Sequence, residues 1–181
     1  PLNFGSLRHK HLCHFISNTK DSLREAKILG FVISTTLKQH YDIIILELTK
    51  SKETNLGLLA LSEEHLRDGG KMIINGDNQV GVKSFLKNIS DLWPAEITAI
   101  KKKGRIALYQ KKDQLFGHWK KYQYFRINRD GYYTRSDMFS PNEVDKGSQK
   151  LTYAFSTELF GEVADLGAGW GYLSKEALRL N

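Results

Sequence analysis

The chain has 181 residues, of which 40% are hydrophobic and 26% charged, with a formal net charge of +7 at pH 7. This composition is typical of soluble globular proteins, and the length suits one or two domains. No apolar run approaches the roughly 20 residues of a membrane-spanning helix, and no signal-peptide pattern opens the chain. The single cysteine, Cys13, excludes an internal disulfide. We therefore expect a cytoplasmic protein, not bound to a membrane, whose basic charge favours an acidic partner such as RNA.

Cys13 lies in a short cluster of metal-binding residue types, His9-Lys10-His11-Leu12-Cys13-His14. Structural zinc sites usually pair two such groups across a longer loop, and the sequence has no second group. We therefore predict no metal site.

Residues 41–48 form a short apolar run rich in β-branched side chains, which is typical of a strand buried on both faces in a parallel sheet. A helix is expected over residues 52–66, with three leucines along one side. We expect Asp68-Gly69-Gly70 to end it.

Two further strand-and-helix signals follow. Residues 71–74 predict a short strand and residues 75–78 a turn. Apolar side chains from Val82 to Ile89 repeat at helical spacing. Residues 96–100 and 104–110 predict a hairpin around a basic turn. This order of elements predicts an α/β sheet with an antiparallel finish.

The segment from Lys101 to Arg126 is basic and aromatic, with nine Lys or Arg residues and one acid, Asp113. Such a segment can neutralise phosphates and stack on unpaired bases, or its aromatic rings can pack in a core. We expect the lysines at turns and in the linker to face water. The candidate RNA-binding residues are Lys101, Lys102, Lys103, Lys111, Lys112, Lys120 and Lys121.

The stretch Asp165-Leu166-Gly167-Ala168-Gly169-Trp170-Gly171 carries the strongest functional signal. A predicted strand at Val163-Ala164 precedes it and a predicted helix from Tyr172 to Leu178 follows. Glycines allow positive φ and a close approach of the backbone to a ligand. A dinucleotide fingerprint would place its third glycine one residue later. The spacing D-x-G-x-G-x-G therefore points to a different nucleoside-containing cofactor.

This stretch resembles motif I of class I S-adenosylmethionine-dependent methyltransferases. Together with Met138-Phe139-Ser140 and Asp145-x-Gly147-Ser148 it resembles the RsmC-like small-subunit ribosomal RNA guanine-N2 methyltransferases of the methyltransferase small family. The segment 66–74 is similar to the passage into the fifth strand of that fold. The resemblance implies cofactor contacts at Asp165, Gly167, Ala168, Gly169 and Gly171. It also implies contacts at Phe139, Asp145, Gly147 and Ser148.

The same resemblance implies a class I methyltransferase, Rossmann-like α/β fold with two methyltransferase domains. Residues 1–112 would be a degenerate domain, 113–135 a basic and aromatic linker, and 136–181 the first part of the S-adenosylmethionine-binding domain. A helix is expected over 147–159, with Leu151, Ala154, Phe155 and Leu159 directed inward.

The family's Asn-Pro-Pro-Phe catalytic motif needs adjacent prolines, whereas the prolines here are Pro1, Pro94 and Pro141. We therefore expect no catalytic residue within the chain, and no activity from it alone. The resemblance implies that the intact protein methylates a guanine amine in RNA, with ribosomal RNA or the small ribosomal subunit as partner. Two alternatives stay open, namely an RNA-binding module without enzymatic activity and a methyltransferase that acts on a small molecule or a protein.

Overall fold

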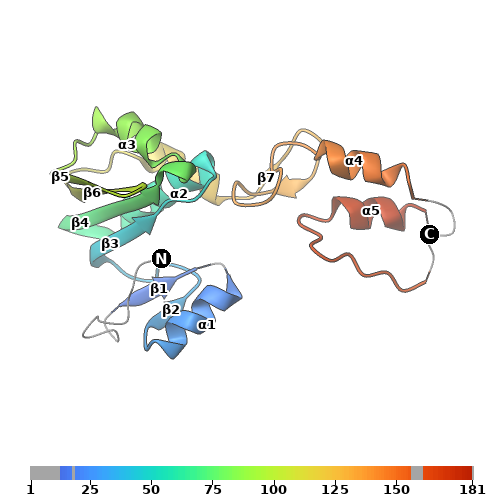
Figure 1. Cartoon of the computed structure of the whole chain (residues 1–181), viewed down its shortest axis with the longest axis horizontal. Helices are drawn as coiled ribbons and strands as arrows, with labels where there is room; N and C mark the ends of the chain where they lie inside the picture. The colour runs from blue at the N-terminus through green and yellow to red at the C-terminus, as the bar shows by residue number, and fades with distance from the viewer. Residues whose placement is uncertain (1–12, 18, 156–160, 181) are drawn as a thin grey trace. The chain divides into compact units, whose positions relative to one another are not determined.

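The computed structural model describes residues 13–17, 19–155 and 161–180 (Figure 1). The chain divides into two compact units, residues 1–42 and 43–181. None of the described helices combines the length and the hydrophobicity needed to cross a membrane.

The first unit contains a small strand-helix-strand motif. Strand β1 (His14–Ile16) pairs in parallel with β2 (Val32–Ser34), and helix α1 (Lys20–Ile28) connects them. Ala26 of α1 and Phe31 are buried between these elements. The motif therefore has a small core of its own.

A four-stranded sheet forms the centre of the second unit, in the order β3-β4-β6-β5. The strands are β3 (Tyr41–Glu47), β4 (Leu66–Asp77), β5 (Ile97–Lys101) and β6 (Gly104–Gln110). The β5–β6 hairpin was predicted, and its antiparallel register pairs Ile97 with Leu108 and Lys101 with Gly104. β4 pairs with β6 in the antiparallel sense, which places Met72 opposite Tyr109.

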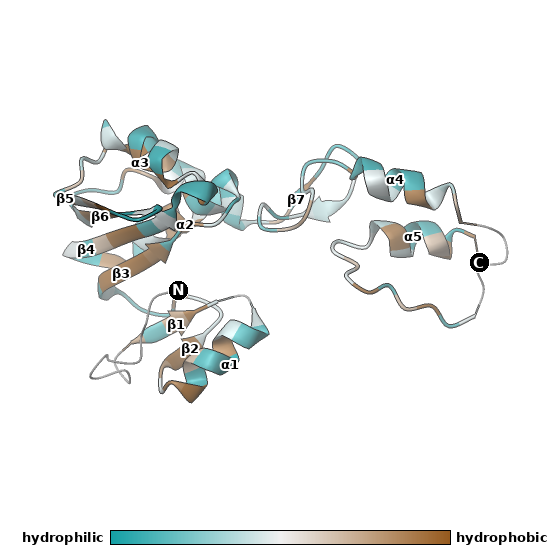
Figure 2. Ribbon diagram, in the orientation of Figure 1, coloured by the Kyte–Doolittle hydropathy of each residue, from teal (hydrophilic) through white to brown (hydrophobic). Residues whose placement is uncertain are grey.

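Helices α2 (Lys52–His65) and α3 (Val82–Ser90) pack on one face of this sheet, as their sequence patterns predicted. A short 3₁₀ helix, η3 (Asn78–Val80), precedes α3. Figure 2 shows the hydrophobic stretches of the strands against these helices. The core residues include Leu56, Leu59 and Leu66, which the sequence placed together, and also Met72, Ile74, Phe85, Ile89, Trp93 and Ala107.

Three predictions about the strands and their ends were wrong. β3 is not buried on both faces, because Ile43 and Ile45 are 58% and 52% exposed and no described element of their own unit covers that face. Residues 68–70 do not form a break after the helix, because β4 already begins at Leu66. Gly69 adopts a φ of +71° inside the strand, and the ladder continues where Lys111 N donates to Gly70 O at 2.9 Å. The residues predicted as a turn, 75–77, also belong to β4.

The first part of the predicted linker packs on α2. Helix η4 (Gly117–Gln123) lies against α2, and Phe116 is fully buried. The buried carboxylate of Glu63 accepts hydrogen bonds from Leu115 N at 2.8 Å and Phe116 N at 2.9 Å. This segment is therefore fixed to the sheet domain.

The remaining elements are a two-stranded ribbon, β7 (Arg126–Ile127) with β8 (Tyr133–Thr134), and the helices α4 (Lys146–Thr152) and α5 (Tyr172–Leu178). α5 has the predicted bounds. α4 packs against α5.

Three details of this region differ from prediction. α4 is shorter than expected, and residues 156–160, which include Leu159, lie outside the described residues. Leu151 is 50% exposed and Ala154 is exposed, so these two side chains are not directed inward as predicted, while Phe155 is half-buried. Val163-Ala164 forms no strand, since no described segment pairs with it.

Candidate functional site

The loop Asp165–Gly171 leads directly into α5, and its three glycines all have left-handed backbone conformations. φ is +83° at Gly167, +58° at Gly169 and +88° at Gly171. Any other L-residue in this region costs roughly 1–2 kcal/mol. A Cβ at Gly167 or Gly171 would meet no atom within 4 Å, so conformation rather than crowding requires glycine there. The backbone of the loop is therefore not covered by a side chain at these three glycines.

Asp165 is oriented by the helix that follows the loop. Its Oδ2 accepts a hydrogen bond from Ser174 Oγ at 2.7 Å, and the side chain is half-buried. Within the loop, Gly171 N donates to Ala168 O at 2.8 Å. The carboxylate and the glycine backbone are therefore held together as one local structure.

Trp170 connects this loop to the Phe-Ser segment. Its Nε1 donates to Phe139 O at 2.9 Å. The Trp170 ring also packs against Tyr132, at 4.6 Å between centroids, and Lys175 Nζ lies 4.4 Å from the centre of the Tyr132 ring. Two segments that are distant in sequence, and that the sequence named as cofactor contacts, thus lie in direct contact.

The Asp145-x-Gly147-Ser148 motif forms the beginning of α4. Asp145 Oδ2 accepts from Ser148 N at 2.9 Å and caps the helix. A Cβ on Gly147 would lie 2.9 Å from that same oxygen, so a larger residue would displace the cap. These three residues form no hydrogen bond with the glycine loop in the described part of the chain, whereas Phe139 does through Trp170.

Sequence reasoning missed Tyr132, Trp170, Tyr172 and Lys175 as neighbours of the loop. Trp170 and Tyr172 have ring centroids 6.0 Å apart, as do Tyr132 and Tyr172. Trp170, the aromatic residue just before Gly171, could have been noticed in the sequence. Its contact with Tyr132 could not, because Tyr132 is distant in sequence.

The hairpin turn between β5 and β6 carries three exposed lysines, Lys101, Lys102 and Lys103. Lys102 has a φ of +54°, and Lys103 O accepts from Asn78 N at 2.7 Å, which fixes the turn. The three ammonium groups are therefore displayed to solvent on a defined backbone, as expected.

The other candidate lysines differ among themselves. Lys111 was expected to face water but is only 8% exposed, because its Nζ donates to Leu66 O at 2.6 Å and lies 3.6 Å from Asp68. Lys120 is half-buried and forms an ion pair with Glu64 at 2.6 Å. Lys112 and Lys121 are exposed.

The aromatic residues of the basic segment also separate into two groups. Tyr109 and Phe116 belong to the core, and Trp119 is stacked on Phe116 at 5.0 Å between centroids. Tyr124 and Phe125 are 65% and 56% exposed. Core packing therefore explains the first group, whereas the second group is exposed, with Arg135 Cζ 5.4 Å from the centre of the Phe125 ring.

No group of three or more possible metal ligands occurs among the residues that the structure describes. His9 and His11 of the N-terminal cluster lie outside those residues.

Two family models match the chain. "Methyltransferase small domain N-terminal" covers residues 8–122, and "Methyltransferase small domain" covers residues 131–181. The division between them falls within the predicted linker.

Curated relatives include the ribosomal RNA small subunit methyltransferase C proteins of Haemophilus influenzae and Actinobacillus succinogenes. The first (strain PittEE) is 31% identical over 168 residues, which is 89% of this chain and 48% of the relative. The second is 32% identical over 139 residues, which is 73% of this chain and 41% of the relative. The chain thus spans about half the length of the curated relatives it matches.

Among solved structures, the T. thermophilus 16S rRNA N2 methyltransferase (RsmC), in complex with AdoMet and guanosine, aligns with a TM-score of 0.72. The alignment covers 92% of this chain and 50% of that chain, at 19% sequence identity. At this identity the likeness shows a common fold.

Proposed function

This chain belongs to the methyltransferase small family and has the class I methyltransferase fold, and we propose that it serves S-adenosylmethionine-dependent methylation of guanine N2 in small-subunit ribosomal RNA. The acceptor is proposed from the relatives, which are named as small-subunit RNA methyltransferases, and from the guanosine bound to the T. thermophilus enzyme. The partner would be ribosomal RNA or the small ribosomal subunit.

We assign the parts of the chain as follows. Residues 1–112 form a methyltransferase-like domain without a glycine motif and act as a scaffold. Residues 113–135 connect it to residues 136–181, which contribute the donor-binding loop. The packing of Phe116 and η4 on α2 supports a fixed start to the connection.

The residues around the glycine loop suit the methyl donor. S-adenosylmethionine, when bound, supplies a methyl group on a sulfonium centre for transfer to a nucleophilic amine. Gly167 and Gly171 leave open space beside the backbone, so an adenosine moiety can approach without meeting a Cβ. Asp165, oriented by Ser174, supplies a carboxylate, and Phe139 and Trp170 supply aromatic surface next to it. Asp145, Gly147 and Ser148 shape the opposite wall in this proposal.

RNA would contact the exposed lysines, Lys101, Lys102, Lys103, Lys112 and Lys121. When exposed lysines bind RNA phosphates, the counterions of those phosphates are released into solution, which favours binding. Lysines at a turn lose little hydration in this process. Lys111 and Lys120 are already engaged by protein acceptors, so we give them mainly structural roles.

The observation that carries the proposal is the fixed glycine loop with Asp165 beside it. The first test is the affinity of the 181-residue chain for labelled S-adenosylmethionine. We expect Asp165→Ala to lower that affinity about tenfold or more, since a lost charge-assisted hydrogen bond is worth about 1.5–3 kcal/mol and 1.4 kcal/mol is tenfold. Glu162→Ala removes an exposed acid just before the loop and serves as the matched control.

Methyl transfer to 16S ribosomal RNA would be measured with protein that spans the full length of the curated relatives. N2-methylguanine in the product, lost with Asp165→Ala, is the expected result. A different methylated product would refute the proposal that guanine N2 is the acceptor. RNA binding without donor binding or transfer would favour an RNA-binding module instead.

A further inference from the structure

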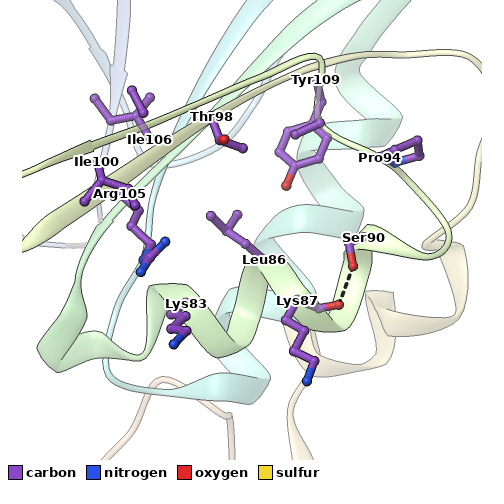
Figure 3. A pocket seen from close by; sticks show the side chains of 12 residues that line it. Lys83, Leu86, Lys87, Ser90, Pro94, Thr98, Ile100, Arg105, Ile106 and Tyr109 are labelled. Carbon is purple, nitrogen blue, oxygen red and sulfur yellow. Dashed lines mark hydrogen bonds between the residues drawn. The ribbon is translucent and has the colours of Figure 1, made fainter.

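A pocket of about 340 Å³ lies between α3 and the β5–β6 hairpin, and no residue of the glycine loop lines it (Figure 3). Leu86 of α3 forms its floor, and Thr98 and Ile100 of β5 and Tyr109 of β6 line the facing sheet. Its walls are mainly apolar. The sequence analysis did not predict this pocket, and it is not part of the proposed donor site.

The charged groups of the pocket all have one sign. Lys83 and Lys87 stand one helical turn apart on α3 with exposed side chains that point away from the sheet, and Arg105 extends from β6 toward α3. None of the twelve lining residues is acidic. Lys83, Lys87 and Arg105 form no ion pair with any residue that the structure describes. The edge of the pocket therefore carries three positive charges, two of them on exposed lysines, and no acidic lining residue.

Two hydrogen-bond donors in the pocket lack protein acceptors. Arg105 Nε is buried and has no hydrogen-bond partner among the described residues, which is costly for a guanidinium. The hydroxyl of Tyr109 points into the pocket and bonds to no described residue, although the residue as a whole is buried. The phenol is protonated at neutral pH and can donate a hydrogen bond, and burial raises its pKa further, to about 12. The Tyr109 hydroxyl can therefore donate to an anionic or carbonyl acceptor in the pocket, and the exposed end of the Arg105 guanidinium can pair with an anion.

We propose that this pocket binds one unpaired nucleotide of an RNA strand, an inference that rests on the proposed RNA substrate. Lys83, Lys87 and Arg105 bind the phosphate, while Leu86 and Ile100 contact the nucleoside. The volume is at the lower end of small-ligand pockets, about 300–1,000 Å³, and suits a single nucleotide better than a duplex.

The exposed turn lysines extend this site along the strand. Ile100 pairs in register with Arg105 directly beside the turn that contains Lys102 and Lys103. A strand with one nucleotide in the pocket would therefore place its neighbouring phosphates over the turn. The pocket explains how a charged turn, which alone binds any polyanion, would gain a preference for single strands.

The test uses the ¹⁵N-labelled 181-residue chain and a ten-nucleotide oligouridine RNA, followed by amide shifts and by affinity at several salt concentrations. The variant Lys83→Ala/Lys87→Ala keeps good helix formers on α3. The control Lys27→Ala/Lys38→Ala removes the same charge from exposed positions in the first unit.

We expect the RNA to shift the amides of Leu86 and Ile100. The pocket variant should lower affinity about tenfold and reduce the salt slope by about one to two, whereas the control should keep the affinity within about twofold. Equal effects of the two variants, or binding without shifts at the pocket, would overturn the proposal. If inorganic phosphate or uridine monophosphate bound as tightly as the decamer, the RNA assignment would be wrong.

A ten-base-pair duplex RNA provides the last comparison. Equal affinity for duplex and single strand would also contradict a nucleotide pocket. Methyl transfer is not measured in this experiment. The RNA-binding experiment can therefore refute the nucleotide pocket while the proposed function stands. Likewise, the donor-binding experiment can refute the donor site while the nucleotide pocket is confirmed.

Discussion

Glu63 provides a direct test of how residues 113–123 are held to the sheet domain. Its carboxylate is 2% exposed and accepts the N–H groups of Leu115 and Phe116. Glu63→Ala leaves both backbone donors without an acceptor. At about 1–3 kcal/mol for each unsatisfied group, the free energy of unfolding should fall by about 2–6 kcal/mol. Glu63→Gln retains one acceptor oxygen and should cost about 1–3 kcal/mol.

The assay is urea unfolding followed by tryptophan fluorescence. Trp93 and Trp119 both pack against Phe116, with ring centroids 5.7 and 5.0 Å away, so they report on this region. With an m-value of about 1–3 kcal/mol per M, a loss of 3 kcal/mol lowers the midpoint by about 1–3 M. Glu64→Gln is the control, because it removes the charge of the neighbouring acid, whose half-exposed ion pair with Lys120 is worth about 0–1 kcal/mol. Equal midpoints for Glu63→Ala and Glu64→Gln would refute the reasoning.

Three further predictions concern other parts of the chain. Folding raises the pKa of Tyr109 from 10.0 to about 12, so its stabilising effect is complete below pH 10 and is lost as the pH rises toward 12; a phenolate absorbance titration should lose this late step in Tyr109→Phe. Gly167→Ala forces alanine into a φ of +83° and should weaken donor binding about tenfold, whereas Gly161→Ala, with a φ of +90° outside the loop, should leave calorimetric donor affinity unchanged. Lys111→Met should lower the midpoint of thermal unfolding and leave RNA affinity unchanged, whereas Lys112→Met should lower RNA affinity in filter binding and leave the midpoint unchanged. Loss of RNA affinity in Lys111→Met with an unchanged midpoint would contradict the burial of Lys111.

The elements with a clear period were predictable from sequence. α3 and the β5–β6 hairpin lie within a residue or so of their predicted bounds. Their apolar spacing and the basic turn are local signals, so no knowledge of neighbours was needed. The glycine spacing likewise showed where positive φ is allowed, and Gly167, Gly169 and Gly171 all adopt it.

Features that depend on distant partners were not predictable. β4 extends to Leu66 across two glycines because other strands supply hydrogen bonds, and local propensity there favours a break. Burial of Lys111 depends on Leu66 O, 45 residues away in sequence. The exposed lysines and the buried one are both charged residues in a basic run, and only the tertiary structure distinguishes them.

Trp170 and Phe139 would give the proposed donor site an entropic advantage. Their hydrogen bond already holds together two segments 31 residues apart in sequence. A ligand that contacts both segments would otherwise have to restrict them on binding, and that restriction would weaken its affinity. Here folding has ordered them in advance, so the site is preorganised. By the same linkage, ligand binding should stabilise the Phe139 segment against local unfolding, even where the ligand touches only the glycines.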